Sequence, residues 1–453
     1  MKLHKLLLLI YFIFFSAILC FSQDTTPTTV EDNTISLRRE RERTLAFGLN
    51  SEVSGLIKEF IASKDLSYND HVLKLFSNTK SDQILRDIIE LYTVLKSNNL
   101  TNQVIEKIKD RDYETRSVIV AGIRYISEIK AVKENQELFL ELLNDNQREY
   151  RIEAIKALTA TGNKNYSKSL MELYETEDEP SVRLQILLDI GKLEDPATAE
   201  FLKDIASDKY LERTYRQYAI NSLGYLKDEN SFDDLVAAYK EDDPLIRIYA
   251  LSAIAKYDKK EANAIILESM RDENWRIRKQ AITDAGERKS KDFVQILIYR
   301  VDKDPVEDIR MTSLTALSEI GGKEAFDFIR SKAMDARASV KMRHHAFTLA
   351  VNKDTANSLT MIETIFEKES SASNKAFLES LTSELCKVEY SGLSPFFEKM
   401  LDSSSVVIRI AGLRGIRLNK ISSLKDKVKA IAEDQKQATA VKNNALATLE
   451  SLK

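Results

Sequence analysis

An arginine that recurs at nearly constant spacing constrains the fold of this chain more than any other sequence feature. Its copies are Arg116, Arg151, Arg183, Arg216, Arg247, Arg278, Arg310 and Arg343, separated by 35, 32, 33, 31, 31, 32 and 33 residues. Arg409 follows 66 residues later, and a degenerate copy centred on Lys375 divides that gap. Weaker copies stand at Arg86 and Lys442. Such a period predicts stacked repeats, in which each unit meets its neighbours in the same way.

Each repeat is predicted to be a helical hairpin. Apolar or small residues stand one position before the basic residue and three, four and seven positions after it, which lines one face of a helix. A second amphipathic stretch comes first, for example residues 232–239 and 293–301. Acid-proline pairs such as Asp243-Pro244 suit the start of a helix. Because one hairpin cannot bury its apolar face alone, we expect an all-α fold, an α-solenoid of stacked hairpins.

Composition fits this fold and argues against one class of partner. Six Pro and twelve Gly in 453 residues leave room for long helices, and 43% of the residues are apolar. The formal net charge is -4, and it becomes about -6 if Lys2 and Lys5 are removed with the first 22 residues. A mildly acidic chain lacks the basic footprint of a nucleic-acid binder, so we expect no nucleic-acid partner.

Residues 1–22 have the pattern of a secretory signal peptide. Basic residues come first, residues 6–19 are almost wholly apolar, and Ser22 is a small residue at a plausible cleavage point before Gln23. The apolar run is shorter than the ~20 residues needed to cross a bilayer, so we expect no transmembrane span in the mature chain. The predicted location is the periplasm, the extracellular space or the cell envelope.

The two cysteines bear on export and stability. Cys20 suggests an alternative, a lipid anchor, but the bulky Leu19 before it argues against lipidation. After cleavage only Cys386 remains, so no disulfide can form within the chain. We expect Cys386 to be a small buried residue on a helix.

The rest of the chain divides into three predicted segments. Residues 23–37 lack an apolar period and are expected to form a flexible linker. Helical periodicity starts next, and residues 38–79 are predicted to be an N-terminal helical cap. Residues 80–453 are predicted to be the repeat array, with about eleven to twelve hairpins.

These repeats resemble the HEAT-repeat family, in particular the short bacterial HEAT-like repeats associated with phycobilisome lyases. The shared pattern is an acidic turn, an aliphatic residue and Arg, two spacers, Ala and an aliphatic residue, then an aliphatic residue often followed by Gly, as at Gly224 and Gly286. The segment from Asp272 to Arg278 shows it most clearly. The resemblance implies that the recurring arginines are structural and pair with turn acids, and that Trp275 is a packing residue. It implies a binding scaffold, although a fold does not fix an activity.

No sequence pattern points to catalysis. The chain has no His-Glu-x-x-His, Cys-x-x-Cys, Gly-x-Ser-x-Gly or phosphate-binding glycine motif. His344 and His345 are adjacent, so on a helix their side chains diverge by about 100° and make a poor metal pair. We therefore expect no enzyme activity, no cofactor and no catalytic or metal-binding residues.

A candidate partner-binding surface follows from the repeat register. In HEAT-like stacks the second helix of each hairpin lines the concave side, and its residues two, five and nine positions after the basic residue point away from the core. The candidate residues at these positions are Tyr218, Asn221, Tyr225, Tyr249, Ser252, Lys256, Gln280 and His345. Tyrosines among small polar residues suit protein contact, although such tyrosines could instead be packed at the seams between repeats.

The function expected from the sequence is an exported, non-enzymatic scaffold that holds a protein or peptide partner on its concave face. Two alternatives stay open. A lyase-like enzyme or enzyme accessory is suggested by the family resemblance alone, and bound pigment would support it. A polysaccharide-binding protein of the envelope would be favoured by a flat, exposed row of tyrosines.

Overall fold

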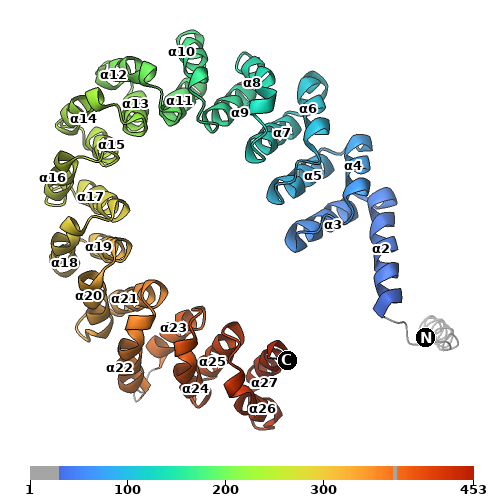
Figure 1. The fold of residues 1–453 in the computed structure, drawn as a ribbon, viewed down its shortest axis with the longest axis vertical. Coiled ribbons are helices and arrows are strands. Elements are labelled where there is room, and N and C mark those ends of the chain that lie inside the picture. The colour runs from blue at the N-terminus through green and yellow to red at the C-terminus, as the bar shows by residue number, and fades with distance from the viewer. Residues whose placement is uncertain (1–29, 371–374, 453) are drawn as a thin grey trace, which may run out of the picture. The chain divides into compact units, whose positions relative to one another are not determined.

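The protein, seen in a computed structural model, is described for residues 30–370 and 375–452, and every regular element in those ranges is helical. The chain forms two compact units that divide at residues 185 and 186, within α11 (Pro180–Asp189). Inside each unit an even-numbered helix is followed by an odd-numbered one, and successive pairs stand side by side (Figure 1). The all-α solenoid architecture predicted from the sequence is confirmed. The predicted signal peptide, Cys20 and residues 23–29 lie outside the described residues.

The first unit contains four complete helix pairs. Its helices are α2 (Val30–Phe47), α3 (Asn50–Ser63), α4 (Asn69–Asn78), α5 (Asp82–Val94), α6 (Thr101–Lys109), α7 (Arg116–Glu128), α8 (Gln136–Leu142), α9 (Arg148–Thr159) and α10 (Ser167–Thr176). The odd-numbered helices α3, α5, α7 and α9 pack against one another in sequence.

The second unit contains eight pairs among its described residues. Its even-numbered helices are α12 (Ala199–Ser207), α14 (Phe232–Tyr239), α16 (Lys260–Ser269), α18 (Val294–Lys303), α20 (Lys323–Met334), α22 (Leu359–Ser370), α24 (Ser394–Leu401) and α26 (Lys425–Glu433). Its odd-numbered helices are α13 (Arg213–Leu226), α15 (Pro244–Ile254), α17 (Trp275–Arg288), α19 (Glu307–Ile320), α21 (Val340–Lys353), α23 (Ala376–Leu385), α25 (Val406–Leu418) and α27 (Thr439–Ser451). Within this unit the odd-numbered helices line the inner side of an arc (Figure 1).

The N-terminal boundaries differ from those predicted. Helix α2 begins at Val30, so residues 30–37 are helical, whereas a linker was expected over 23–37. Their polar composition hid the helix, because residues 30–37 show no apolar stripe at helical spacing. The boundary at residue 80 falls inside the pair α4–α5, and α3 packs on α5 as α5 packs on α7. Helix α3, within residues 38–79, therefore packs on the array in the way that later inner helices pack on one another.

The odd-numbered helices approach one another closely because small residues occupy their seams. Gly224 on α13 faces α15, where a Cβ atom on Gly224 would lie 2.6 Å from the Cα of Ala253. Gly286 faces Ala316 on α19 in the same way, at 3.1 Å. The glycine that follows the last apolar position thus serves close helix contact and not a turn.

Several of the recurring arginines tie their own hairpin to the next one. Arg151 donates two hydrogen bonds to Glu177, at 2.7 and 2.8 Å, and one to the carbonyl of Asp145 in its own turn. Arg278 makes the same fork with Asp304, at 2.9 and 3.0 Å, and Arg247 reaches Asp272 at 2.5 Å. These pairs, in which the acid belongs to the following hairpin, confirm the expected structural role for Arg151, Arg247 and Arg278. Arg310 instead donates to the carbonyls of Asp304 and Pro305 in its own turn.

The structure also corrects the register of the weaker copies. In the regular repeats the arginine is the fourth residue of its helix, and the fourth residues of α3, α5, α7 and α23 are Val53, Leu85, Ile119 and Glu379. Arg116 and Lys375 were therefore misplaced by three and four residues, and Arg86 by one. Glu379 accepts a hydrogen bond from Ser405 of the next hairpin at 2.5 Å, and Arg111 provides the link expected of Arg116 by pairing with Asp145 at 2.5 Å.

Two single residues complete the comparison. Cys386 is buried at the end of α23, as expected. Trp275 is not the packing residue that was predicted, because its side chain at the start of α17 is 38% exposed and the guanidinium of Arg276 lies 4.7 Å from its ring centre.

Candidate partner-binding surface

The predicted tyrosines lie on two neighbouring inner helices of the second unit. Tyr218 and Tyr225 belong to α13, and Tyr249 belongs to α15, which packs against α13. Tyr218 and Tyr249 are half-buried, whereas Tyr225 is 38% exposed. Burial, together with the neighbouring Tyr218, raises the pKa of the Tyr249 phenol, so the Tyr249 ring stays neutral at physiological pH. The three tyrosines therefore form a partly buried cluster in which Tyr225 is the most exposed ring, and not a flat exposed row.

Lys256 joins two of these residues across a seam. It extends from the end of α15, with its ammonium 4.7 Å from the ring centre of Tyr225 on α13. The ammonium also lies 3.4 Å from the carbonyl of Ser252, one turn earlier. An exposed cation over an aromatic ring contributes about 0.5–1 kcal/mol, so this contact holds the Tyr225 ring in place. Asn221, on the same face of α13, is half-buried.

Gln280 connects this surface to a buried carboxyl between the inner helices. Its amide donates a hydrogen bond to Oδ1 of Asp284 at 2.9 Å, one turn along α17. Asp284 is only 2% exposed, and its Oδ2 has no hydrogen-bond partner among the described residues. Burial raises the pKa of the Asp284 carboxyl to about 7. The sequence gave no warning of this carboxyl, because one Asp on a charged helix resembles many others.

His345 is on α21, two inner helices after α17. Its Nε2 and the hydroxyl of Thr315 on α19 are 2.8 Å apart. Burial lowers the pKa of the imidazole, so His345 is uncharged at neutral pH. The predicted residues thus form one patch on α13, α15 and α17 and a separate contact between α19 and α21.

The side chains of this surface are of a kind that suits contact with a protein. No group of three or more His, Cys, Asp or Glu residues in the described ranges is arranged to hold a metal ion. Half-buried aromatic rings beside small polar side chains lose little side-chain freedom on binding, which suits them to protein contact.

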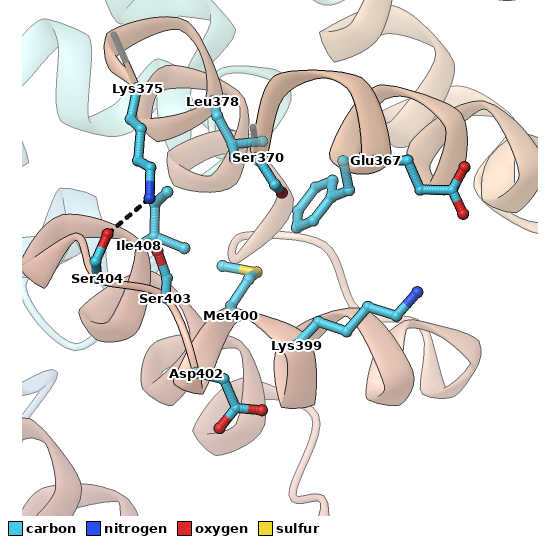
Figure 2. Close-up of a pocket in the computed structure, with 11 residues that line it drawn as sticks. Glu367, Ser370, Lys375, Leu378, Lys399, Met400, Asp402, Ser403, Ser404 and Ile408 are labelled. Carbon is cyan, nitrogen blue, oxygen red and sulfur yellow. Dashed lines mark hydrogen bonds between the residues drawn. The ribbon is translucent and has the colours of Figure 1, made fainter. Parts of the chain in front are cut away.

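Cavities in the second unit lie away from the predicted residues, and two of them are in its C-terminal part. One, of about 470 Å³, lies among α22, α23 and α24, and Figure 2 shows Lys375 reaching Ser404, 2.7 Å away. Its wall includes Ser370 and Lys375, which flank residues 371–374 outside the described part of the chain.

The other cavity, of about 740 Å³, lies between the inner helices α23 and α25 and includes Arg414 and Leu418 in its lining. Sequence reasoning missed it. These residues stand five and nine positions after Arg409, so the rule that selected Asn221 and Tyr225 would have found them.

In the part of the chain that the structure describes, no helix combines the length and the apolar character needed to cross a membrane.

The family model described as spirochaete HEAT repeat protein matches residues 45–448. No curated protein sequence matches the chain significantly.

Several solved structures resemble this fold at low sequence identity. Kap121p is 12% identical, with a TM-score of 0.41 over 93% of this chain and 54% of that one, so the chain spans about half its length. Importin beta is 10% identical, with a TM-score of 0.42 over 94% of this chain and 68% of that one. The complex of CpcE and CpcF of phycocyanin lyase from Nostoc sp. PCC7120 is 16% identical, with a TM-score of 0.31 over 56% of this chain and 94% of that one.

Proposed function

Because the chain belongs to the spirochaete HEAT repeat protein family, we propose that it is a non-enzymatic scaffold that binds a protein or peptide partner on the inner helices of its second unit. The observation that carries this proposal is the patch formed by Tyr218, Tyr225 and Tyr249 on α13 and α15. Its rings are held at the seam, with Tyr225 pinned by Lys256, so a partner meets a surface that is already ordered.

The proposal includes export to the cell envelope. Support comes from the basic start and apolar run of residues 1–22. Fractionation of native cells followed by mass spectrometry of the N-terminus tests this part. A mature chain that begins at Gln23 in the periplasmic or extracellular fraction agrees with the proposal. A lipidated N-terminus at Cys20 would establish the anchored alternative, and an uncleaved chain in the cytoplasm would contradict export.

Crosslinking of the native protein, with mass spectrometry of the captured chains, tests partner binding. We expect the crosslinks to fall on α13 and α15. The Tyr225→Ala variant should weaken capture of the identified partner by about fivefold or more, as expected for an aromatic anchor worth at least about 1 kcal/mol. Tyr225 suits this test because its exposed ring can be removed without opening the core.

Tyr210→Ala and Tyr299→Ala provide matched controls in the same unit. Both rings are more exposed than that of Tyr225, and Tyr299 is on the even-numbered helix α18. Capture that survives Tyr225→Ala but is lost with Tyr299→Ala would place the partner on the outer helices and refute the proposed surface.

A further inference from the structure

The cavity between α23 and α25 has a lining that sets it apart from the tyrosine patch. Its walls are Ser383, Cys386, Lys387, Val407, Ile410, Ala411, Arg414, Arg417 and Leu418. Both helices are inner helices of the second unit and pack against each other. A volume of about 740 Å³ lies in the range of sites that enclose a bulky side chain or a small ligand.

The apolar part of this cavity is open to solvent. Val407 is 47% exposed and Leu418 is 38% exposed, and half-buried Ile410 lies between them on α25. Leu418 stands nine positions after Arg409, where the earlier inner helices carry Tyr225, Lys256, Glu287, Glu319 and Asn352. A bulky aliphatic side chain at this solvent-facing position is thus a departure from the other regular repeats.

The charged part of the cavity is basic, and two of its three cations have no acidic partner among the described residues. Arg414 stands five positions after Arg409, where the earlier helices carry Asn221, Ser252, Thr283, Thr315 and Thr348. Among the described residues neither Arg414 nor Arg417 forms a salt bridge, whereas Lys387 pairs with Glu384 at 2.8 Å. Two unpaired guanidinium groups on an acidic chain therefore flank an exposed apolar floor.

We propose that this cavity is a second docking site, which binds a protein segment carrying bulky aliphatic side chains beside carboxylates. The aliphatic side chain would cover Val407, Ile410 and Leu418. Its neighbouring carboxylates would receive the planar hydrogen-bonding fork of Arg414 and Arg417, which matches a carboxylate better than any other acceptor in proteins except phosphate. The charge complementarity selects an acidic segment over a neutral or basic one.

Fluorescence anisotropy with short dye-labelled peptides tests this site in the full mature chain. A peptide of alternating glutamate and leucine should bind saturably, and more weakly as salt is raised, because salt screens the exposed charges. Peptides of alternating glutamate and serine, and of alternating lysine and leucine, should bind at least about tenfold more weakly, since each lacks one half of the complementarity.

Variants place the binding within the cavity. Arg414→Gln with Arg417→Gln should weaken the glutamate-leucine peptide by about tenfold, as expected for two exposed charge pairs. Arg337→Gln with Lys341→Gln removes the same charge from exposed positions elsewhere in this unit and should leave affinity unchanged. Equal affinity of both double variants would overturn the proposal, as would equal binding of the three peptides.

Two other occupants would also overturn it. A dimer in sedimentation that Leu418→Ser dissociates would show that a second copy covers the cavity. Saturable binding of oleate without binding of the peptide would assign it to a lipid. The site shares no residue with the tyrosine patch, so Tyr225→Ala should not affect the peptide, and failure of either site leaves the other testable.

Discussion

Replacing Asp284 by Asn tests the most unusual polar group of the inner helices. The carboxyl is buried on α17, receives one hydrogen bond from Gln280, and has an unpartnered Oδ2 among the described residues. Burial is the main cause that raises its pKa to about 7, Glu287 adds to the rise, and Lys256 and Arg288 oppose it. Asn keeps the shape and the acceptor but cannot ionise.

The sign of the effect follows from the two pKa values. The carboxyl titrates near 3.8 when unfolded and near 7 when folded, so between these values the folded state binds the proton more tightly. Stability therefore falls as pH rises from about 4 to 7 and stays lower above. Three pKa units correspond to roughly 4 kcal/mol as an upper bound. The unpaired amide donor that Asn brings costs about 1–3 kcal/mol. The free energy of unfolding of Asp284→Asn should therefore exceed that of the native chain by about 1–3 kcal/mol at pH 8, and should not exceed it near pH 4.

Trp275 supplies a local probe for this measurement. It is the only Trp of the chain and stands at the start of α17, the helix that carries Asp284. Urea unfolding followed by Trp275 fluorescence should give a higher midpoint for Asp284→Asn at pH 8 and an equal or lower one at pH 4.5. The local signal matters because a solenoid need not unfold as one cooperative unit.

Asp304→Asn is the matched control, because Asp304 is a buried carboxyl that is paired with Arg278 of α17. Asp304 is also buried, but it accepts both hydrogen bonds of the Arg278 fork, so its charge is compensated. Breaking that pair should cost about 3–5 kcal/mol at both pH values. If Asp284→Asn showed the same loss at both pH values, or the same pH slope as the native chain, the argument from burial would be refuted.

Three further experiments test the helix packing, the repeat register and the burial of Cys386. Gly224→Ala should destabilise by about 1–3 kcal/mol in thermal unfolding, since its Cβ would press on Ala253, whereas Gly55→Ala on α3 meets open space and should stabilise by about 0.5–1 kcal/mol. Arg111→Ala should cost about 2 kcal/mol or more and Arg116→Ala under about 0.5 kcal/mol, a difference that circular dichroism in urea would detect and that equal losses would contradict. Cys386 should react with iodoacetamide at pH 8 at least about tenfold more slowly than free cysteine, because burial blocks the thiol and raises its pKa, and a normal rate would show an exposed thiol.

The fold could be read from the sequence wherever the arginine accompanies the apolar pattern. From Arg151 to Arg343 each copy is the fourth residue of its inner helix. From that position Arg151 reaches Glu177, just after the next outer helix, and Arg343 reaches Glu369, in the last turn of the next outer helix. The N-terminal helices α3, α5 and α7 carry Val53, Leu85 and Ile119 at that position. Without the arginine only the apolar period remained, and on a short helix that period fits registers three or four residues apart equally well.

The candidate surface was only partly predictable for a related reason. The register identifies which side chains leave the core, and it placed Tyr218, Tyr225 and Tyr249 on one patch. The register does not predict which side chains of two neighbouring helices contact each other. The contact of Lys256 with Tyr225, and the empty space between α23 and α25, depend on packing between residues about 30 positions apart.

Asp284 is a carboxyl at a position where the other repeats carry a small, uncharged residue. It stands six positions after Arg278, at the seam position that Ser222, Ala253 and Ala316 occupy in other repeats. A small residue is required there because the preceding inner helix comes close, as Gly224 does to Ala253. A carboxyl in that place lowers stability at neutral pH, yet it is held by Gln280, a residue of the predicted partner surface. A partner that captured the amide hydrogen which Gln280 donates to Asp284 would remove the one side-chain hydrogen bond of that carboxyl, and its proton affinity would then change.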